Sequence, residues 1–210
     1  AACPRAAQAE GKLRSGAPAD TMDKPIGYPS HPRLVSGRAG SKFSMHGMMD
    51  TVLNLRLNDA SVEGLAAQSG NPRFAWDSYR RLVQMFARTV LGVDGDLFEH
   101  ALDEAKKAKG LTNDLDLDEQ DLRALVDVFK AIVQSSTGSA FPQGPREQMD
   151  LAVEAVFDSW NGDRAKLYRR QERIPADLGT AVNICSRVFG NMSMDSGTGV
   201  AFTRAPGAGA

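Results

Sequence analysis

The sequence predicts an α+β fold in which a long helical region lies between two short regions of β-structure. From about residue 59 to residue 175, apolar side chains recur every three or four positions, which is the spacing of amphipathic helices. Short apolar runs rich in β-branched residues stand on either side of this region. The order of β-structure, helices and β-structure again indicates an α+β arrangement with the helices in one lobe.

The N-terminal region is predicted to be irregular up to about residue 32. It is rich in alanine, glycine and proline and has neither helical nor strand periodicity. A short strand is expected at 34–36, and a polar, glycine-containing loop follows at 37–51. We therefore separate an irregular segment, 1–32, from a phosphate-loop region, 33–58, whose name rests on the argument given below.

Signals at helix ends divide the central region into separate helices. Asp50 and Thr51 have side-chain oxygens that suit an N-cap, so a short helix is expected directly after them. A second helix is expected at about 60–68. Asn71 followed by Pro72 is a strong start signal for a third helix. The apolar stripe of that third helix consists of Ala75, Tyr79, Leu82, Val83, Phe86 and Val90.

Further helices are expected beyond a glycine-bracketed break at 92–95. One of them begins after Asp118 and ends near Gly138, and the next follows a rigid connector at 141–145. A basic stretch at 164–171 extends or follows that helix and is expected to be a solvated helix face. The region from 71 to 171 should therefore be almost entirely helical. Both tryptophans fall on its apolar stripes and are expected in the core, namely Trp76 and Trp160.

β-structure is expected to return at Gly179. Alternating apolar residues predict one strand at 182–189 and another at 199–203. A polar turn at 190–195 would join the two strands into a hairpin. The expected division is thus a helical lobe at 59–175 and a hairpin region at 176–210.

The composition excludes several classes of protein. The 25 basic and 26 acidic side chains nearly cancel, so no net field favours nucleic acid or an anionic membrane as a partner. No apolar stretch approaches the roughly 18 residues needed to cross a bilayer, and the first residues do not resemble a secretory signal. A soluble, cytoplasmic protein is therefore expected.

The cysteines and histidines give no metal or disulfide signal. Cys3 and Cys185 lie at opposite ends of the chain, so we expect a buried thiol at Cys185 and a reducing compartment. His31, His46 and His100 share no metal-ligand spacing. No metal ligands are therefore predicted.

The loop at 37–51 is the most suggestive feature for function. Glycine lets a backbone approach a phosphate closely, and a helix N-terminus presents free N–H groups to an anion. Arg38 and Lys42 would add positive charge, and Thr51 would add a hydroxyl. The loop contains neither GxxxxGK[ST] nor GxGxxG, so a polar loop without a ligand is the alternative.

A second glycine-rich stretch, 195–199, precedes Arg204. An exposed guanidinium at the end of a strand would suit a phosphate oxygen. A hairpin turn with a glycine bulge explains the stretch equally simply, and an ordinary surface arginine explains Arg204. The residues alone leave the function open.

Several long strings of this sequence resemble one known family. Residues 44–59, SMHGMMDTVLNLRLND, resemble a segment SMPGMMDTVLNLGLND of the pyruvate, phosphate dikinases. Other strings similar to that family follow in the family's order, at 69–81, 157–161, 179–183 and 188–204. Related phosphoenolpyruvate synthases have a loop similar to the first of these strings. The Met-Met-Asp at 48–50 and the Phe-Asp-Ser-Trp-Asn at 157–161 nevertheless favour the dikinases.

The resemblance implies part of an ATP-grasp-like nucleotide-binding domain, with ATP and Mg²⁺ as ligands. In the family, a phosphoryl group passes from ATP to a histidine on a separate domain and then to pyruvate on a third. ATP, pyruvate and phosphate give AMP, phosphoenolpyruvate and pyrophosphate. The phosphohistidine and pyruvate-binding domains are the implied partners, in an enzyme that is a homodimer. The implied nucleotide-binding residues are Arg38, Gly47, Met48, Asp50, Thr51 and Arg204.

The match also has departures and missing parts. His46 stands where the family has proline, and Arg56 stands where it has glycine, so any positive φ at Arg56 would be strained. The family's glycine-lysine-glycine segment, its metal-holding residues and its phosphohistidine have no counterpart here. We therefore expect no catalytic residues and no activity from this chain alone. A non-catalytic remnant and a piece of a related phosphoenolpyruvate synthase are the alternatives.

Overall fold

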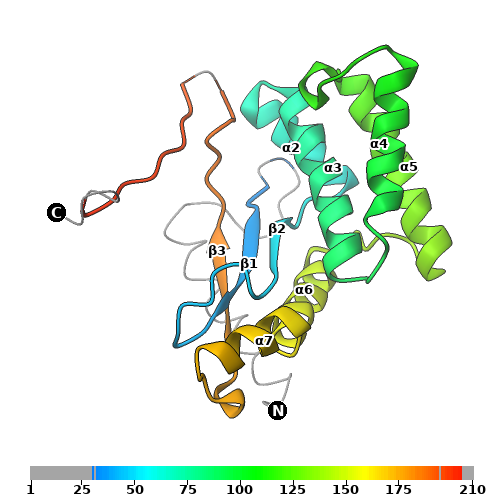
Figure 1. The fold of residues 1–210 in the computed structure, drawn as a ribbon. Coiled ribbons are helices and arrows are strands. Elements are labelled where there is room, and N and C mark those ends of the chain that lie inside the picture. The colour runs from blue at the N-terminus through cyan, green and yellow to red at the C-terminus, as the bar shows by residue number, and fades with distance from the viewer. Residues whose placement is uncertain (1–29, 31, 194, 205–210) are drawn as a thin grey trace.

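A small sheet with helices packed beside and beneath it makes up the fold (Figure 1). The computed structural model describes residue 30 and residues 32–193 and 195–204. The combination of helices and one small sheet is consistent with the predicted α+β class. The irregular segment predicted at 1–32 lies almost wholly outside the described residues, as do Cys3 and His31.

The sheet consists of three antiparallel strands in the order β2-β1-β3. They are β1 (Val35–Gly40), β2 (Thr51–Leu55) and β3 (Ala181–Ser186). The strand predicted at 34–36 is confirmed and continues to Gly40. β1 is the central strand, with an irregular register against β2 between Val35 and Gly37.

Two predictions about β-structure are wrong. Thr51 begins strand β2 rather than a helix, because this β-branched stretch pairs with β1, and Arg38 lies opposite Thr51. The hairpin does not form either: β3 pairs with β1, and residues 199–203 form no strand in the described structure. Local alternation does not show that β3 has a distant partner, so the sequence pointed to its neighbour instead.

The buried thiol predicted at Cys185 is also wrong. Exposed and half-buried side chains alternate along β3, and Cys185 falls at an exposed position. A strand with one covered face places alternate residues on the open side. Cys185 therefore lies on the open side of β3, although apolar residues stand near it in the sequence.

The helical region follows the predicted boundaries closely. From 71 to 171 the described chain is mainly helical, but less completely than predicted, because non-helical connections lie at 90–95, 109–118 and 138–144. The cap at Asn71 is confirmed, since its side chain accepts from Phe74 N at 3.1 Å. Capping boxes at Asn58 and Asp118 start two other helices. The α-helices are α2 (Asp59–Ser69), α3 (Pro72–Thr89), α4 (Asp96–Ala108), α5 (Glu119–Thr137), α6 (Pro145–Ser159) and α7 (Asp163–Gln171). Short 3-10 turns are η1 (Asp114–Asp116) and η2 (Ala176–Leu178).

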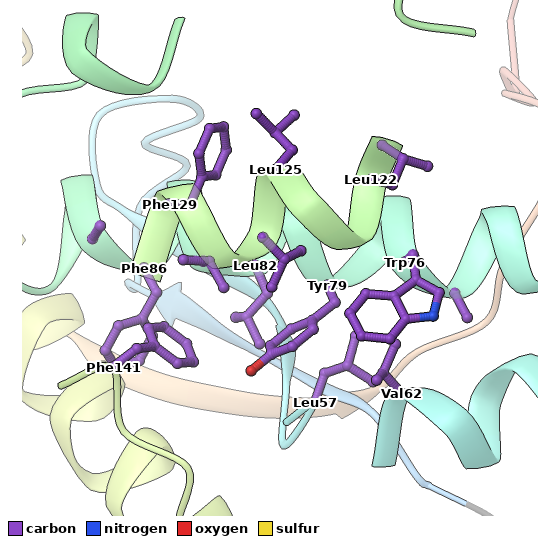
Figure 2. Close-up of a cluster of buried hydrophobic side chains, with 14 of the residues drawn as sticks. Leu57, Val62, Trp76, Tyr79, Leu82, Phe86, Leu122, Leu125, Phe129 and Phe141 are labelled. Carbon is purple, nitrogen blue, oxygen red and sulfur yellow. The ribbon is translucent and has the colours of Figure 1, made fainter. Parts of the chain in front are cut away.

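The main core lies around α3, which contacts α2, α5 and strand β2. Figure 2 shows its side chains between α3 and α5. Tyr79 and Phe86 have no exposed surface, and both rings pack edge-on against Phe141. Trp76 and Trp160 are buried, as predicted. No helix in the described part of the chain is both long and apolar enough to span a membrane.

Candidate nucleotide-binding site

A cavity of about 1070 Å³ lies between the sheet, helix α6 and the loop that joins β1 to β2. β1 and β3 form one wall, and Val153 and Phe157 of α6 form another. Helix α6 contacts all three strands, so it is packed against the sheet beside the cavity. A concave space with mixed apolar and polar walls is the usual form of a small-molecule site.

The charge of the cavity is one-sided. Arg33, Arg38 and Arg56 line it, and no Asp or Glu is found among its described lining residues. Positive groups gathered in a concave, low-dielectric surface concentrate field lines and attract anions. The cavity is therefore chemically suited to phosphate or carboxylate groups.

Arg38 occupies the middle of the sheet. It lies opposite Thr51 on β2 and opposite Asn183 on β3, and it is exposed. Its charge adds to burial in lowering the pKa of Arg187. Because the flanking strands are paired with β1, the backbone holds Arg38 and Thr51 beside each other at the cavity wall.

Close packing between β1 and β3 shapes the same wall. A Cβ atom added at Gly40 would overlap the side-chain amide of Asn183. Both residues line the cavity. Glycine is thus required at position 40 for Asn183 to hold its present place.

The loop from β1 to β2 closes one side of the cavity, and Gly47 is its turning point. Gly47 has φ of 71°, which glycine adopts without strain, and apart from its two chain neighbours no residue has an atom within 4 Å of the place where a Cβ would be. The turn is closed by Met48 N, which donates to Met45 O at 3.1 Å. The backbone at Gly47 is therefore open to an approaching ligand.

A small apolar cluster holds this loop against α6 and α7. Buried Met45 packs with Trp160, and Met48 and Met49 pack on the same cluster. Tyr168 donates its hydroxyl to Ser44 O at 3.3 Å. These contacts give the loop a defined position beside the cavity.

Arg169 is an exception to the solvated basic face predicted at 164–171. It is 5% exposed, its guanidinium lies 4.0 Å from the centre of the Trp160 ring, and Nη1 donates to Trp160 O. A guanidinium stacks readily on an aromatic face, so Trp160 buries it. Its exposed neighbour Arg170 shows the predicted behaviour.

The residues predicted to bind nucleotide divide into two groups. Arg38, Gly47 and Thr51 line the cavity together, whereas Met48, Asp50 and Arg204 are not part of its lining. Asp50 faces α6 and α7: its N–H donates to Ser159 Oγ at 3.1 Å, and Oδ1 lies 3.7 Å from Arg164 Nη2. Arg204 is exposed near the end of the described segment beyond β3, and that last part runs away from the helical lobe (Figure 1).

Comparison with known proteins decides the family. Residues 36–210 match the family described as "Pyruvate phosphate dikinase, AMP/ATP-binding domain". The chain belongs to this family. The match includes β2, β3, all of β1 except Val35, and every described helix, together with Arg38, Arg56 and the loop beside them.

Individual dikinases are similar to nearly the whole chain. The chain is 51% identical to pyruvate, phosphate dikinases of Giardia intestinalis and Clostridium symbiosum over 187 residues, which is 89% of this chain and 21% of each relative. It is 52% identical to pyruvate, phosphate dikinase 2 of Zea mays over 188 residues, 90% of this chain and 21% of that protein. The chain thus spans about a fifth of the length of these relatives.

Sequence reasoning missed two residues of this dikinase-family cavity. Arg33 precedes β1, and it is buried because β3 returns beside it, where Ser186 Oγ accepts from Arg33 Nη2 at 2.6 Å. Arg56 follows β2 and was noted solely for its departure from glycine. The pairing of β1 with β3 joins residues about 150 positions apart, and no local pattern predicts it.

A Mg²⁺ ion does not fit the described lining. Mg²⁺ takes oxygen ligands and is usually held through carboxylates, and this lining contains none. No group of three or more His, Cys, Asp or Glu is placed to hold a metal in the described parts of the chain. The described residues of the cavity are therefore suited to a phosphate group and not to a Mg²⁺ ion bound with it.

Proposed function

We propose that the cavity binds the phosphate groups of ATP in a pyruvate, phosphate dikinase. The observation that carries this proposal is the convergence of Arg38, Gly47 and Thr51 on a cavity that has arginines and no carboxylate in its described lining. The family to which the chain belongs is described by AMP/ATP binding, which supports ATP as the ligand. The positive lining of the cavity complements the negative charge of the phosphates of ATP.

Each residue has a distinct part in the proposed site. Arg38 makes paired, charge-assisted hydrogen bonds to phosphate oxygens. The open backbone at Gly47 lets N–H groups of the loop reach the phosphates, and Thr51 adds a hydroxyl. Because β2 is a strand, these N–H groups come from the loop and not from a helix N-terminus. Arg204 is outside the lining, so its contribution is tested separately below.

Met48 and Asp50 act as positioning residues in this proposal. Met48 packs on the cluster around Trp160, and Asp50 N is bonded to Ser159 on α6. Both residues hold the stretch of chain that directly follows Gly47. Phosphoryl transfer depends on positioning and charge neutralisation, so a fixed loop contributes to it without touching the reacting atoms.

We propose that the site serves the whole dikinase reaction, in which ATP, pyruvate and phosphate give AMP, phosphoenolpyruvate and pyrophosphate. The described histidines, His46 and His100, are not assigned the role of phosphoryl carrier. The transferred group would be received by a histidine domain and then by a pyruvate-binding domain elsewhere in the enzyme. The 210 residues would then act as one portion of an ATP-grasp-like domain.

Mapping of ATP contacts by NMR tests the proposed location. When ATP is added to the ¹⁵N-labelled chain, amide shifts should concentrate at Gly40, Gly47 and Thr51. The exposed residues of α4 serve as an internal control because that helix does not line the cavity. Shifts confined to α4 and α5, with none in the loop, would disprove the assignment.

A further inference from the structure

His46 is a proton-binding side chain on the loop that borders the cavity. It directly precedes Gly47, is exposed, and lines the cavity together with that glycine. Histidine is the side chain whose charge ordinarily changes between about pH 5 and pH 8. Among the described lining residues it is the only histidine. The family segment quoted above has proline at this position, so the imidazole is a feature of this chain.

The carboxylates on the elements beside this loop are not part of the cavity lining. Asp50 follows on the same loop, and its Oδ1 lies 3.7 Å from Arg164 Nη2 on α7. Glu154 and Asp158 of α6 are exposed and also lie outside the lining. The described walls of the cavity therefore offer no carboxylate to balance a positive charge on His46.

The other ionisable groups around the cavity do not change charge in the same pH range. Arginine stays protonated throughout, and the charged lining residues are three arginines, Arg33, Arg38 and Arg56. Lys42 is exposed on the same loop, outside the lining, and lysine is also a cation at neutral pH. Cys185 of β3 lines the cavity, and thiols ordinarily ionise at higher pH than imidazoles. A change in the charge of the described lining near neutral pH is therefore a change at His46.

We propose that His46 makes the binding of ATP by this chain depend on pH, with tighter binding when the imidazole is protonated. The inference rests on the proposed nucleotide site and adds its regulation by protons. A negative charge close to an imidazole favours the charged form of the ring. Bound ATP should therefore promote uptake of a proton at His46. Coupling between two ligands is reciprocal, so protonation of His46 should raise the affinity for ATP as the pH falls.

Two substitutions at position 46 separate the effect of charge from that of pH. His46→Gln keeps a polar side chain that is neutral at every pH used, and His46→Lys carries a positive charge throughout. His100→Gln is the matched control, because His100 is exposed on α4 and lies outside the lining. The terminal phosphate of ATP also changes charge near neutral pH. Comparing the chains at the same pH removes that contribution, because the ligand is identical.

Titration with ATP at about pH 6 and about pH 7.5, at constant ionic strength, measures the effect through the amide signal of Gly47. Relative to His46→Gln, the parent should gain about threefold in affinity at the lower pH, as expected for one exposed charged contact. His46→Lys should bind ATP about fivefold more tightly than His46→Gln at both pH values. His100→Gln should keep the pH dependence of the parent.

Equal pH dependence in the parent and in His46→Gln, with both chains binding ATP, would overturn this inference and leave the proposed nucleotide site standing. A change of pH dependence in His100→Gln as large as that in His46→Gln would overturn it as well. Absence of ATP binding in every chain at both pH values would reject the nucleotide site and this inference together.

Discussion

Gln148 on α6 accepts a hydrogen bond from the backbone N–H of Arg56, with 2.8 Å between the two atoms. The same side chain donates through Nε2 to Leu57 O at 2.9 Å and to Pro142 O at 2.8 Å. One fully buried amide thus satisfies two backbone groups where the chain leaves the sheet and a third in the connector before α6. This contact joins helix α6 to the strand end that borders the cavity.

Gln148→Ala should destabilise the chain more than an ordinary polar substitution does. It leaves a buried N–H and two buried carbonyl groups without partners, which should cost about 3 kcal/mol in free energy of unfolding. Urea unfolding measures the change. Gln120→Ala, at an exposed position of α5, is the control and should change stability by no more than about 0.5 kcal/mol. Equal stability of the two variants would show that the amide has no such role.

Arg56→Gly should leave the chain as stable as the parent or more stable, by up to about 1–2 kcal/mol. Glycine removes the strain at φ of 80° and takes a buried cation out of the cavity. Arg56→Ala is the matched comparison, because it removes the charge but keeps the strain. Thermal unfolding in a chloride buffer would contradict the argument if Arg56→Gly melted well below Arg56→Ala.

The helices were predictable because their signals are local. Helix α3 begins with the short signal Asn71-Pro72, in which the asparagine caps the helix. Helix α5 is bounded by a cap at each end, Asp118 at its start and Gly138 at its end. Packing against distant elements does not change these boundaries. Sequence reasoning therefore located the helical lobe well.

The sheet was harder to predict because its pairing is not local. Thr51 has an oxygen that suits a helix cap, but pairing with β1 made it the first residue of a strand. The apolar run at 182–189 predicted a strand correctly, and its partner is β1 and not residues 199–203. Arg38, Gly47 and Thr51 were found from the glycine loop and from family resemblance. Arg33 and Arg56 become cavity residues through β3 and α6, which no local pattern reveals.

Arg169→Gln should loosen the loop at Gly47 from a distance. The substitution removes the guanidinium from the Trp160 ring and should cost about 1–3 kcal/mol in stability. Trp160 packs with Met45, so the loop should become more mobile, and amide exchange at 45–49 should speed up. Arg170→Gln, an exposed neighbour, is the control. Equal exchange rates in the two variants would show that Arg169 does not support the loop.

A polypeptide of these 210 residues should not complete the dikinase reaction alone. It spans about a fifth of the length of the dikinases it matches, and the proposed carrier histidine and pyruvate site belong to other domains. A coupled assay should detect no phosphoenolpyruvate formed from pyruvate, ATP and phosphate. Pyruvate- and phosphate-dependent release of AMP by this polypeptide would contradict the expectation.

Arg204→Ala should leave ATP affinity within about twofold of the parent, because Arg204 is exposed and lies outside the cavity lining. Isothermal titration calorimetry or NMR titration with ATP measures the change. Lys42→Ala, another exposed cation outside the lining, provides a comparison. A loss of tenfold or more in Arg204→Ala alone would place Arg204 in the binding site after all.

The affinity of Arg38→Ala for ATP is the measurement that tests the central claim most directly. Loss of one charged contact to phosphate should weaken binding about ten- to a hundredfold. Arg88→Ala removes the same charge from an exposed position of α3 outside the cavity, so it controls for net charge. The account predicts a large loss of affinity in Arg38→Ala and parent-like binding in Arg88→Ala. Parent-like ATP binding in both variants would contradict it.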